Sequence, residues 1–321
     1  MLPSVSVLLA VYNEAATIDE CLASLADQDY RGTWEVLVAD GGSSDGTVDR
    51  ITDWVERVPI RIFENPDRLQ SYGLNLLTSI SGASLLVRAD AHTTYSSDYI
   101  ARSVDALLTS GADAVGGPMR PQGETGFGRA VAAAYRSKIG IGPARFHHAE
   151  QPVLGDTVYL GTMTRETFLA NGGLRSFPSQ VAEDADFFYR LRARGGRILI
   201  DPAIRSIYRP RAEPGALWRQ FFRYGLGKAD MLYVNGEFPS WRPLAPLALV
   251  VGILAGVLLG LIASTWLPLL LLLAAWAVVL IAGARARPLE VAAISIMHLS
   301  YGIGLVRGLL RWPRSVRAQV S

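Results

Sequence analysis

The sequence has a single cysteine, Cys21, among its 321 residues, and this excludes an intrachain disulfide. Such scarcity is typical of a domain that faces the reducing cytoplasm. The formal net charge is only +2, so the chain lacks the strong positive field that favours nucleic-acid binding. The first residues contain no basic segment, and the apolar run of residues 5–11 is too short for a signal peptide. We therefore expect a large domain that is not exported and has no nucleic-acid partner.

Charge is missing altogether from one long stretch near the carboxyl end. Residues 243–284 contain no Asp, Glu, Lys, Arg or His, and this run is about twice the ~20 residues that cross a bilayer core. Residues 264–268 interrupt it near the middle. Because lipid-exposed backbone must be hydrogen-bonded internally, we expect a helical hairpin of residues 244–263 and 267–284. The alternative is a pair of buried core helices, but the rest of the chain is too small to cover so much apolar surface.

A third apolar segment, residues 291–310, is weaker because it contains His298, Arg307 and three glycines. It either spans the bilayer or lies in the cytoplasmic interface, and the interfacial position keeps the nearby arginines on one side of the membrane. Anionic lipid headgroups suit these arginines. They are Arg285, Arg287, Arg307, Arg311, Arg314 and Arg317. We therefore divide the chain into a globular domain, residues 1–230, and a membrane domain, residues 231–321.

The globular part alternates between strand and helix patterns. Apolar runs rich in β-branched residues predict strands at residues 5–11, 34–39, 60–63 and 85–89. Helical spacing follows each of the first three strands. This alternation predicts an α/β fold with a mostly parallel sheet flanked by helices. Ligands of such sheets bind beyond the carboxyl ends of the strands.

The helices between these strands have recognisable limits. Thr17 and Glu20 have the spacing of a capping box at the start of the first helix. The second is expected over residues 47–58, where Pro59 stops it, and the third over residues 72–80. From about Gly116 to Tyr159 the periodicity weakens, which predicts mobile loops.

Several familiar binding motifs are absent. Residues 11–14, the turn after the first strand, contain no glycine, which excludes a G-x-G-x-x-G dinucleotide fingerprint there. Residues 225–229 contain Gly-x-Gly-Lys but lack the spacing of a phosphate-binding P-loop. The sequence also has no cysteine–histidine zinc pattern. The remaining candidates are acids and arginines near strand ends and helix starts.

Two acids follow the second strand. Asp40 closes that strand and leads into Gly41-Gly42-Ser43-Ser44-Asp45. A carboxylate there can accept hydrogen bonds from a nucleoside, and the glycines allow close approach of the backbone. Alternatively, Asp40 and Asp45 only form turns and cap the next helix.

Asp90 and His92 end the fourth strand. Alternate residues of an extended segment project the same way, so both side chains can reach one divalent cation. An oxygen ligand with an imidazole suits Mn²⁺ at least as well as Mg²⁺, and such an ion neutralises a diphosphate leaving group. The alternative is a surface turn with a solvated histidine.

Two later segments carry further candidates. Glu183, Asp184 and Asp186 begin a predicted helix, where acids either complement the helix dipole or include a base that takes a proton from an attacking hydroxyl. Gln220 and Arg223 share one helix face, and the arginine suits a phosphate. The alternative for this second segment is an amphipathic helix that packs its aromatic residues against the domain or the bilayer.

Together these motifs resemble the family 2 inverting glycosyltransferases of the GT-A fold, and in particular the bacterial exopolysaccharide, succinoglycan-type members with carboxyl-terminal membrane helices. The resemblance covers about residues 4–230 and, more loosely, the membrane segment. It is carried by residues 6–51 (SVLLAVYNEAATIDECLASL…WEVLVADGGSSDGTVDRI), Asp90-Ala91-His92, Glu183-Asp184 and Gln220-x-x-Arg223-Tyr224.

The resemblance implies roles for the matching residues. Asp184 would be the general base, and Asp90 with His92 would occupy the place of the D-x-D motif that binds Mn²⁺ or Mg²⁺. His92 stands where the family has a second aspartate. Tyr224 stands where the family has tryptophan, and together with the small membrane part it favours a single transfer over processive polymerisation. The donor-binding residues would be Tyr12, Asn13, Glu14, Asp40, Arg68, Asp90, Gln220 and Arg223.

The implied activity is metal-dependent, inverting transfer of one sugar from a nucleoside-diphosphate sugar, here expected to be a UDP-sugar, to a lipid-linked polyprenyl-diphosphate acceptor. The implied partners are this donor, the lipid-linked glycan, the bilayer and polysaccharide-assembly proteins. The catalytic domain would lie on the cytoplasmic side of the inner (plasma) membrane. Two alternatives stay open: a polyprenyl-phosphate sugar synthase, whose acceptor needs no base, and a non-catalytic nucleotide-sugar-binding subunit of an export complex.

Overall fold

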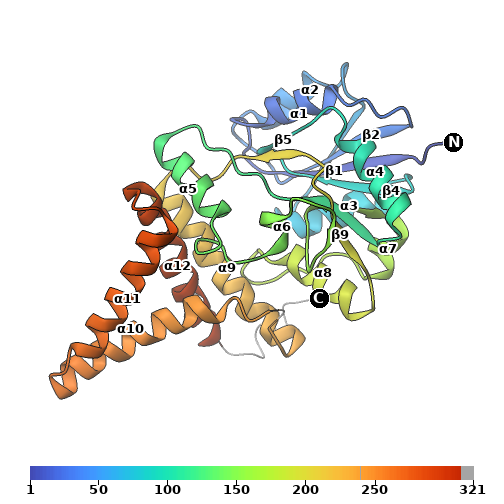
Figure 1. Ribbon diagram of the computed structural model, residues 1–321. Helices are drawn as coiled ribbons and strands as arrows, with labels where there is room; N and C mark the ends of the chain where they lie inside the picture. The colour runs from blue at the N-terminus through green and yellow to red at the C-terminus, as the bar shows by residue number, and fades with distance from the viewer. Residues whose placement is uncertain (239, 312–321) are drawn as a thin grey trace. The chain divides into compact units, whose positions relative to one another are not determined.

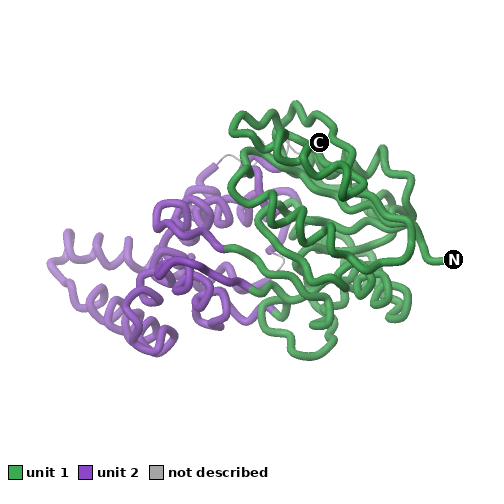
Figure 2. The backbone as a smooth tube through the Cα atoms, turned by 90° about the horizontal axis from the view of Figure 1, so that it is seen from above, with its two compact units in different colours: residues 1–120, 145–176, 183–209 green, residues 121–144, 177–182, 210–321 purple. Residues whose placement is uncertain are grey.

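A computed structural model describes residues 1–238 and 240–311 of the chain (Figure 1). Its contacts divide it into two compact units, coloured separately in Figure 2. Unit 1 comprises residues 1–120, 145–176 and 183–209, and unit 2 comprises residues 121–144, 177–182 and 210–321. The predicted division at residue 230 stays a prediction, because such units reflect contacts within this fold and not independent folding.

Unit 1 is built on an eight-stranded sheet with the strand order β3-β2-β1-β4-β8-β6-β9-β7. The first four strands in the chain pair in parallel, as predicted, whereas β8 pairs antiparallel with β4 and β6. A separate small sheet pairs β10 with β5. The strands are β1 Val5–Val11, β2 Trp34–Asp40, β3 Ile60–Glu64, β4 Leu85–Ala89, β5 Thr93–Tyr95, β6 Ala114–Gly117, β7 Val153–Leu154, β8 Tyr159–Thr164, β9 Ile198–Ile200 and β10 Ser206–Tyr208.

Helices cover this sheet, so β1, the third strand across it, is buried along nearly its whole length. Such burial is expected of a strand covered on both faces. Leu8 lies in a core cluster with Leu74 of α3 and Phe187 of α8. The helices of unit 1 are α1 Ile18–Ala26, α2 Thr47–Thr52, α3 Gln70–Ile80, α4 Tyr99–Ser110, α6 Arg145–His148, α7 Arg165–Ala170 and α8 Glu183–Ala193.

Three local predictions are wrong. Helix α2 ends at Thr52 and not at Val58, because the hydrogen bonds that follow it tighten to three-residue spacing. The capping box at Thr17 does not form, since the Thr17 hydroxyl donates to the Glu14 carboxylate at 3.1 Å. Residues 116–159 are not all loop, because they include helix α5, Gly126–Arg136, which Thr125 caps.

Unit 2 consists of helices, and two of its helices cross in direct backbone contact. They are α9, Pro214–Asn235, and α12, Pro288–Leu309. A Cβ atom on Gly225 would lie 2.1 Å from the Tyr301 carbonyl oxygen, and one on Gly304 would lie 2.1 Å from the Phe222 carbonyl oxygen. Only glycine therefore permits this crossing.

Helices α10, Leu244–Ala263, and α11, Leu267–Gly283, form the hairpin seen in Figure 1, at the bounds expected from the uncharged run to within one residue. Most of their large apolar side chains are exposed. By length and composition, α10 and α12 are able to cross a membrane, and α11 is a shorter apolar helix. Crossing itself stays a prediction. Arg314 and Arg317 lie outside the described residues.

Helix α12 corresponds to the third apolar segment predicted at residues 291–310, and it begins and ends slightly earlier. It packs on α9, α5 and α10. Its His298 accepts a hydrogen bond at Nδ1 from the Trp276 indole at 3.3 Å, and its Nε2 lies 2.8 Å from the Ile139 carbonyl oxygen. These contacts make α12 a central helix of unit 2, whichever relation it has to a bilayer.

Candidate active site

The loops after β1 and β2 are tied together at the carboxyl edge of the sheet. The Asn13 amide oxygen accepts from the Ser44 N–H at 2.9 Å, and the Asn13 N–H donates to the Ser43 hydroxyl at 2.9 Å. The Asp40 carboxylate accepts from the N–H groups of Gly42 and Ser43. Asp40 therefore shapes its own turn, while its position at the end of β2 is the one expected for a nucleoside contact.

Asp45 has the structural role of forming the turn and holding the start of the next helix, which was the alternative to ligand binding. Its carboxylate accepts from the N–H and hydroxyl of Thr47, at the start of α2, and from the Ala15 N–H. These bonds lower the pKa of Asp45, with the Thr47 hydroxyl as the largest cause. Asp45 thus joins the two loops and is not a candidate for ligand binding.

Tyr12 and Arg68 form a stacked pair beside this turn. The Arg68 guanidinium lies 5.9 Å from the centre of the Tyr12 ring, and Tyr12 is 47% exposed. A Cβ atom on Gly41 would lie 3.3 Å from the Tyr12 ring, so glycine keeps this approach open. An exposed ring beside an arginine suits a nucleobase and the phosphates attached to it.

Asp90 lies just beyond β4 and is only 8% exposed. Its carboxylate accepts from the Gln70 side chain at 3.1 Å and lies 3.6 Å from the Arg88 Nε atom. The backbone around it is also held, because the Asp90 N–H donates to the Tyr95 hydroxyl and the Cys21 thiol donates to the Asp90 carbonyl. Burial of that thiol raises the pKa of Cys21.

His92 faces Glu14, from the loop after β1. Its Nδ1 atom lies 3.9 Å from a Glu14 carboxylate oxygen, and its ring packs edge-on against Tyr208. This Nδ1 atom is buried and has no hydrogen-bond partner. The alternative of a solvated histidine in a surface turn therefore does not describe His92, whose Nδ1 atom is buried.

The donor set at Asp90 and His92 fits a divalent cation. The His92 Nδ1 atom is buried without a hydrogen-bond partner, the Glu14 carboxylate lies 3.9 Å from it, and Asp90 is a nearly buried carboxylate two residues before it; these are groups that Mn²⁺ and Mg²⁺ accept. Within the described residues, no three His, Cys, Asp or Glu side chains are grouped to hold a metal ion by themselves. A pair of protein ligands is nevertheless sufficient for an ion that takes its other ligands from substrate phosphates and water.

Arg88 connects this edge to helix α8, and the sequence analysis missed it. Its guanidinium lies 3.6 Å from a Glu183 carboxylate oxygen as well as from Asp90. Burial lowers the pKa of Arg88, but the carboxylates of Asp90, Glu183 and Asp184 more than offset it and leave the pKa above its ordinary value. The available signal was a lone charged residue in an apolar strand, two positions before Asp90.

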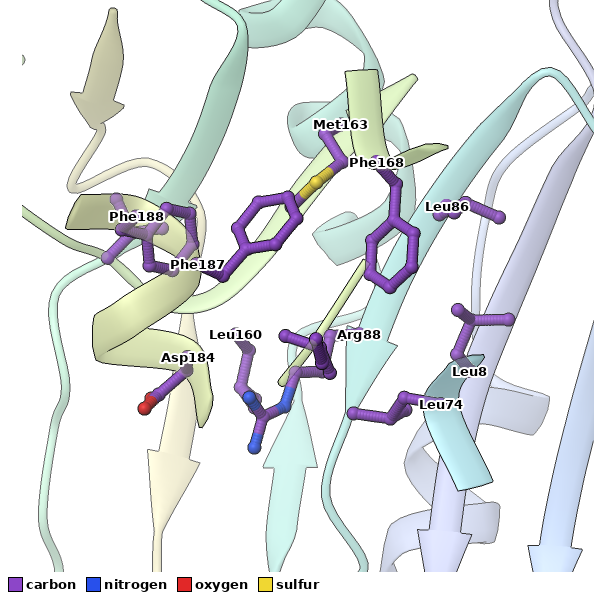
Figure 3. A pocket seen from close by; sticks show the side chains of 13 residues that line it. Leu8, Leu74, Leu86, Arg88, Leu160, Met163, Phe168, Asp184, Phe187 and Phe188 are labelled. Carbon is purple, nitrogen blue, oxygen red and sulfur yellow. The ribbon is translucent and has the colours of Figure 1, made fainter. Parts of the chain in front are cut away.

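Glu183 and Asp184 begin α8 in different surroundings. Glu183 is buried, and burial followed by the Asp184 carboxylate raises its pKa to about 7, although Arg88 acts in the opposite direction. Asp184 is partly exposed and lines a pocket that also includes Arg88. In Figure 3 the charged groups of Asp184 and Arg88 lie at the same end of the pocket, and Phe187 and Phe168 line the part farther from them.

The third acid of this helix is structural. Asp186 is fully buried and binds Arg190 at 2.7 Å, one helical turn later. Arg190 also donates to the Asn171 and Gly173 carbonyl oxygens. Asp186 therefore anchors α8 to the preceding loop and leaves Asp184 as the accessible carboxylate.

Gln220 and Arg223 lie on α9 in unit 2, and their observed contacts are with unit 2. The Gln220 amide donates to the Tyr224 hydroxyl at 3.0 Å. Arg223 donates to the Gln180 side chain at 3.0 Å and to the Ser179 carbonyl oxygen at 3.4 Å. Arg223 also donates to the Gln180 carbonyl oxygen at 3.5 Å, so three of its five N–H donors are in use and two remain for a phosphate.

Comparison with known proteins gives consistent matches. The family model described as "Glycosyl transferase family 2" matches residues 6–167. The "Succinoglycan biosynthesis protein ExoA" of Rhizobium meliloti is 33% identical, with 97% of this chain and 96% of that protein covered. A Methanococcus voltae protein, "Dolichyl N-acetyl-alpha-D-glucosaminyl phosphate 3-beta-D-2,3-diacetamido-2,3-dideoxy-beta-D-glucuronosyltransferase", is 23% identical over 71% of this chain and 74% of its own length.

Among solved structures, a mannosyltransferase from Pyrobaculum calidifontis in complex with GDP-Man and Mn²⁺ superposes with a TM-score of 0.67 at 23% sequence identity. The match covers 97% of this chain and 88% of that one. This likeness shows the GT-A fold, a mixed sheet flanked by helices, as the resemblance implied.

Proposed function

Because this chain belongs to the family 2 glycosyl transferases, we propose that it transfers one sugar, with inversion, from a nucleoside-diphosphate sugar to a lipid-linked acceptor in glycan biosynthesis. The membership makes it a glycosyltransferase. The donor, acceptor and mechanism in this proposal rest on the chemistry of the site.

One observation carries the proposal: Arg88 joins Asp90, at the end of β4, to Glu183, beside Asp184 at the start of α8. A diphosphate leaving group needs positive charge, and an attacking hydroxyl needs a base. These pairs support the proposal, because Asp90 and Glu183, the sequence neighbour of the proposed base Asp184, share one nearly buried guanidinium.

The donor end of the site would be the turn after β2. Tyr12 would stack on the base, Asp40 and Asn13 would contact the nucleoside, and Arg68 would pair with the phosphates. The solved mannosyltransferase complex contains GDP-Man, which supports a nucleoside-diphosphate sugar as the class of donor. Between nucleobases, we propose UDP-sugars first. Gln220 and Arg223 are proposed as further donor contacts.

A divalent cation, Mn²⁺ or Mg²⁺, would be held by Asp90 and His92, with Glu14 beside the histidine. When bound, the ion supplies the positive charge that stabilises a departing diphosphate. The Mn²⁺ in the solved mannosyltransferase complex supports this choice of metal. Gln70 and Arg88 then hold the Asp90 carboxylate in a fixed orientation.

Asp184 would act as the general base. It would take the proton of the acceptor hydroxyl while that oxygen attacks the anomeric carbon from the face opposite the diphosphate. Attack from this face inverts the anomeric configuration. Its partial exposure leaves it accessible to an acceptor, whereas Glu183 and Asp186 are buried.

The apolar helices of unit 2 support a lipid-linked polyprenyl-diphosphate acceptor. Exposed apolar side chains along α10 and α11 suit a bilayer, and such an acceptor lies at a membrane surface. The name of the Methanococcus voltae relative includes a dolichyl phosphate-linked sugar, which is consistent with this class. We place the enzyme at the inner membrane, with the catalytic unit in the cytoplasm and polysaccharide-assembly proteins as partners.

The test uses the full chain in membranes or detergent. UDP-, GDP- and TDP-sugars are offered with Mn²⁺ or Mg²⁺ and either a polyprenyl-diphosphate sugar or a polyprenyl phosphate. We expect transfer to the lipid-linked sugar only. NMR of the product should show that the anomeric configuration of the transferred sugar is inverted relative to the donor. Transfer to the bare phosphate would instead identify a polyprenyl-phosphate sugar synthase. Donor binding without transfer to any acceptor would favour a non-catalytic subunit.

A further inference from the structure

The six residues before Glu183 form a short segment of unit 2, residues 177–182, here called the entry segment. The chain passes from its last residue, Ala182, directly into helix α8 and Asp184. Two of its residues have left-handed backbone conformations although they are not glycine: Gln180 with φ of 58° and Ala182 with φ of 76°. Such conformations are disfavoured for residues with a side chain and persist where surrounding contacts hold them.

Helix α9 supplies these contacts from a single face. Arg223, Gly227 and Asp230 follow one another at helical spacing, so they lie in one row. Arg223 donates to the carbonyl oxygen of Ser179 and to the side chain of Gln180. A further bond, to the Gln180 carbonyl oxygen at 3.5 Å, means that Arg223 restrains the backbone on both sides of this left-handed residue's N–H as well as its side chain.

Asp230 holds the other side of Ser179. Its carboxylate accepts from the Ser179 N–H at 3.0 Å, and it is 0% exposed. The Arg311 guanidinium lies 3.6 Å from its second oxygen, so the buried charge is balanced. A carboxylate is costly to bury unless it is paired and hydrogen-bonded. The Asp230 carboxylate pairs with Arg311 and accepts one backbone hydrogen bond, from the Ser179 N–H.

Gly227 gives the entry segment the space it occupies. A Cβ atom there would lie 2.9 Å from Val181 and 3.0 Å from the Ala182 Cβ atom. Any larger residue would push the segment away from α9. The Gly225-x-Gly227-Lys228 sequence, which lacks P-loop spacing, therefore has a packing explanation at Gly227.

We propose that Asp230, with Arg223 and Gly227, is a positioning residue that holds the entry segment in its left-handed conformations and so sets the direction in which the chain enters α8 at Asp184. This inference rests on the proposed function for the role of Asp184. Asp230 touches no proposed substrate atom and acts through the backbone of residues 179–182.

The test compares Asp230→Leu, which removes the acceptor, with Asp230→Asn, which keeps an oxygen for the Ser179 N–H. For Asp230→Leu we expect kcat to fall by about tenfold to a hundredfold, the range for a small misplacement of a catalytic group. The affinity for the donor should stay within about twofold, because the proposed contacts of Tyr12 and Asp40 with the nucleoside are untouched. Asp230→Asn should retain most of kcat.

A rescue separates positioning from general destabilisation. Glycine adopts a left-handed conformation without the penalty of a Cβ atom. Adding Ala182→Gly to Asp230→Leu should therefore recover kcat by about fivefold. Tyr233→Phe is the matched control on the same helix, because its hydroxyl donates to the backbone carbonyl oxygens of Leu309 and Arg311. This control should lower thermal stability but not kcat.

Amide hydrogen exchange gives a readout that needs no activity. Asp230→Leu should speed exchange across residues 178–185, beginning with Ser179, and Tyr233→Phe should not. If Asp230→Leu does not fold, Gly227→Ala replaces it with the same expectations. Unchanged exchange, unchanged kcat, or a parallel loss of kcat and donor affinity would overturn the proposal. A wild-type protein without transferase activity would refute the proposed function instead. Exchange alone would then decide whether Asp230 holds the entry segment.

Discussion

The Arg88 guanidinium lies 3.6 Å from the Glu183 carboxylate, and both side chains are nearly buried. This pair connects the last part of β4 to the first turn of α8, two elements far apart in the sequence.

Loss of Arg88 should destabilise the fold. Arg88→Met would leave the Glu183 and Asp90 carboxylates buried without their cation, and removing one partner of a buried pair typically costs about 3 kcal/mol. We expect the free energy of unfolding, measured by denaturant titration in detergent, to fall by about that amount. Adding Glu183→Gln should recover part of the loss, because one unpaired charge is removed. An equal or larger loss in the double variant would contradict the pairing.

Glu183 should make stability fall as pH rises. Its pKa is about 7 in the fold and 4.5 in its ordinary environment. A group with a raised pKa adds stability fully below its unfolded pKa, and that contribution is lost as pH rises through its folded pKa. Between pH 4.5 and 7 the slope contributed by this one proton is at most about 1.4 kcal/mol per pH unit.

The measurement is a series of unfolding curves from pH 5 to 8. EDTA is present so that binding of a metal ion does not add its own pH dependence to the stability. Glu183→Gln should flatten the pH dependence. Glu166→Gln makes the same charge change at an exposed position of α7 and should leave the dependence as it is. A profile that stays unchanged in Glu183→Gln would assign the titration to another group.

Asp184→Asn should remove transfer and spare donor binding. A general base contributes about a hundredfold to ten-thousandfold to rate, so kcat should fall within or beyond that range. The dissociation constant for the nucleoside diphosphate should change by less than about twofold, as followed by calorimetry. Asp105→Asn, on the exposed face of α4, is the control. Substantial residual turnover in Asp184→Asn would rule out Asp184 as the base.

Chelation should abolish transfer reversibly. EDTA removes the proposed ion, and added Mn²⁺ or Mg²⁺ should restore activity. Asp90→Asn and His92→Ala should each weaken Mn²⁺ binding by at least about tenfold, measured by electron paramagnetic resonance in the presence of nucleoside diphosphate. Asp49→Asn, exposed on α2, controls for the loss of a surface charge. Full activity in EDTA would refute a metal-dependent mechanism.

Charge on the hairpin should release the chain from membranes. Leu254 and Leu258 lie on the exposed side of α10. An arginine near the centre of a spanning helix costs about 2.5–3.5 kcal/mol on insertion scales. The Leu254→Arg and Leu258→Arg double variant should therefore increase the share of protein extracted by alkaline carbonate. Leu108→Arg, at an exposed position of α4, should leave extraction unchanged.

The sequence predicted the elements whose signals are local. Strand β4 was predicted at its observed bounds because five apolar-rich residues lie between polar ones, and α10 because the uncharged run dictates its length. Helix α2 was predicted too long, since apolar spacing continues beyond Thr52 although the backbone tightens there. Helix α5 was missed because Gly126 and Gly128 weaken its pattern, while packing against α12 stabilises it.

The site could be predicted only in part, for the same reason. Asp90 and Asp184 were found from their places after a strand and at a helix start. Their link through Arg88 could not be found, because it depends on which strand and helix the tertiary fold brings together. Likewise, Arg311 was assigned to lipid headgroups from sequence proximity, whereas it pairs with Asp230 in the structure. Long-range partners of charged residues are not encoded in local spacing.

The burial of Cys21 has a practical consequence for labelling experiments. The thiol is inaccessible, and its raised pKa keeps it from forming the reactive thiolate. Maleimide reagents should therefore not modify the native chain. A cysteine introduced at either end of α10 would be the sole reactive thiol, without any need to remove the natural one. Membrane-impermeant reagents applied to intact cells or to inverted vesicles would then report which end of the hairpin faces each compartment.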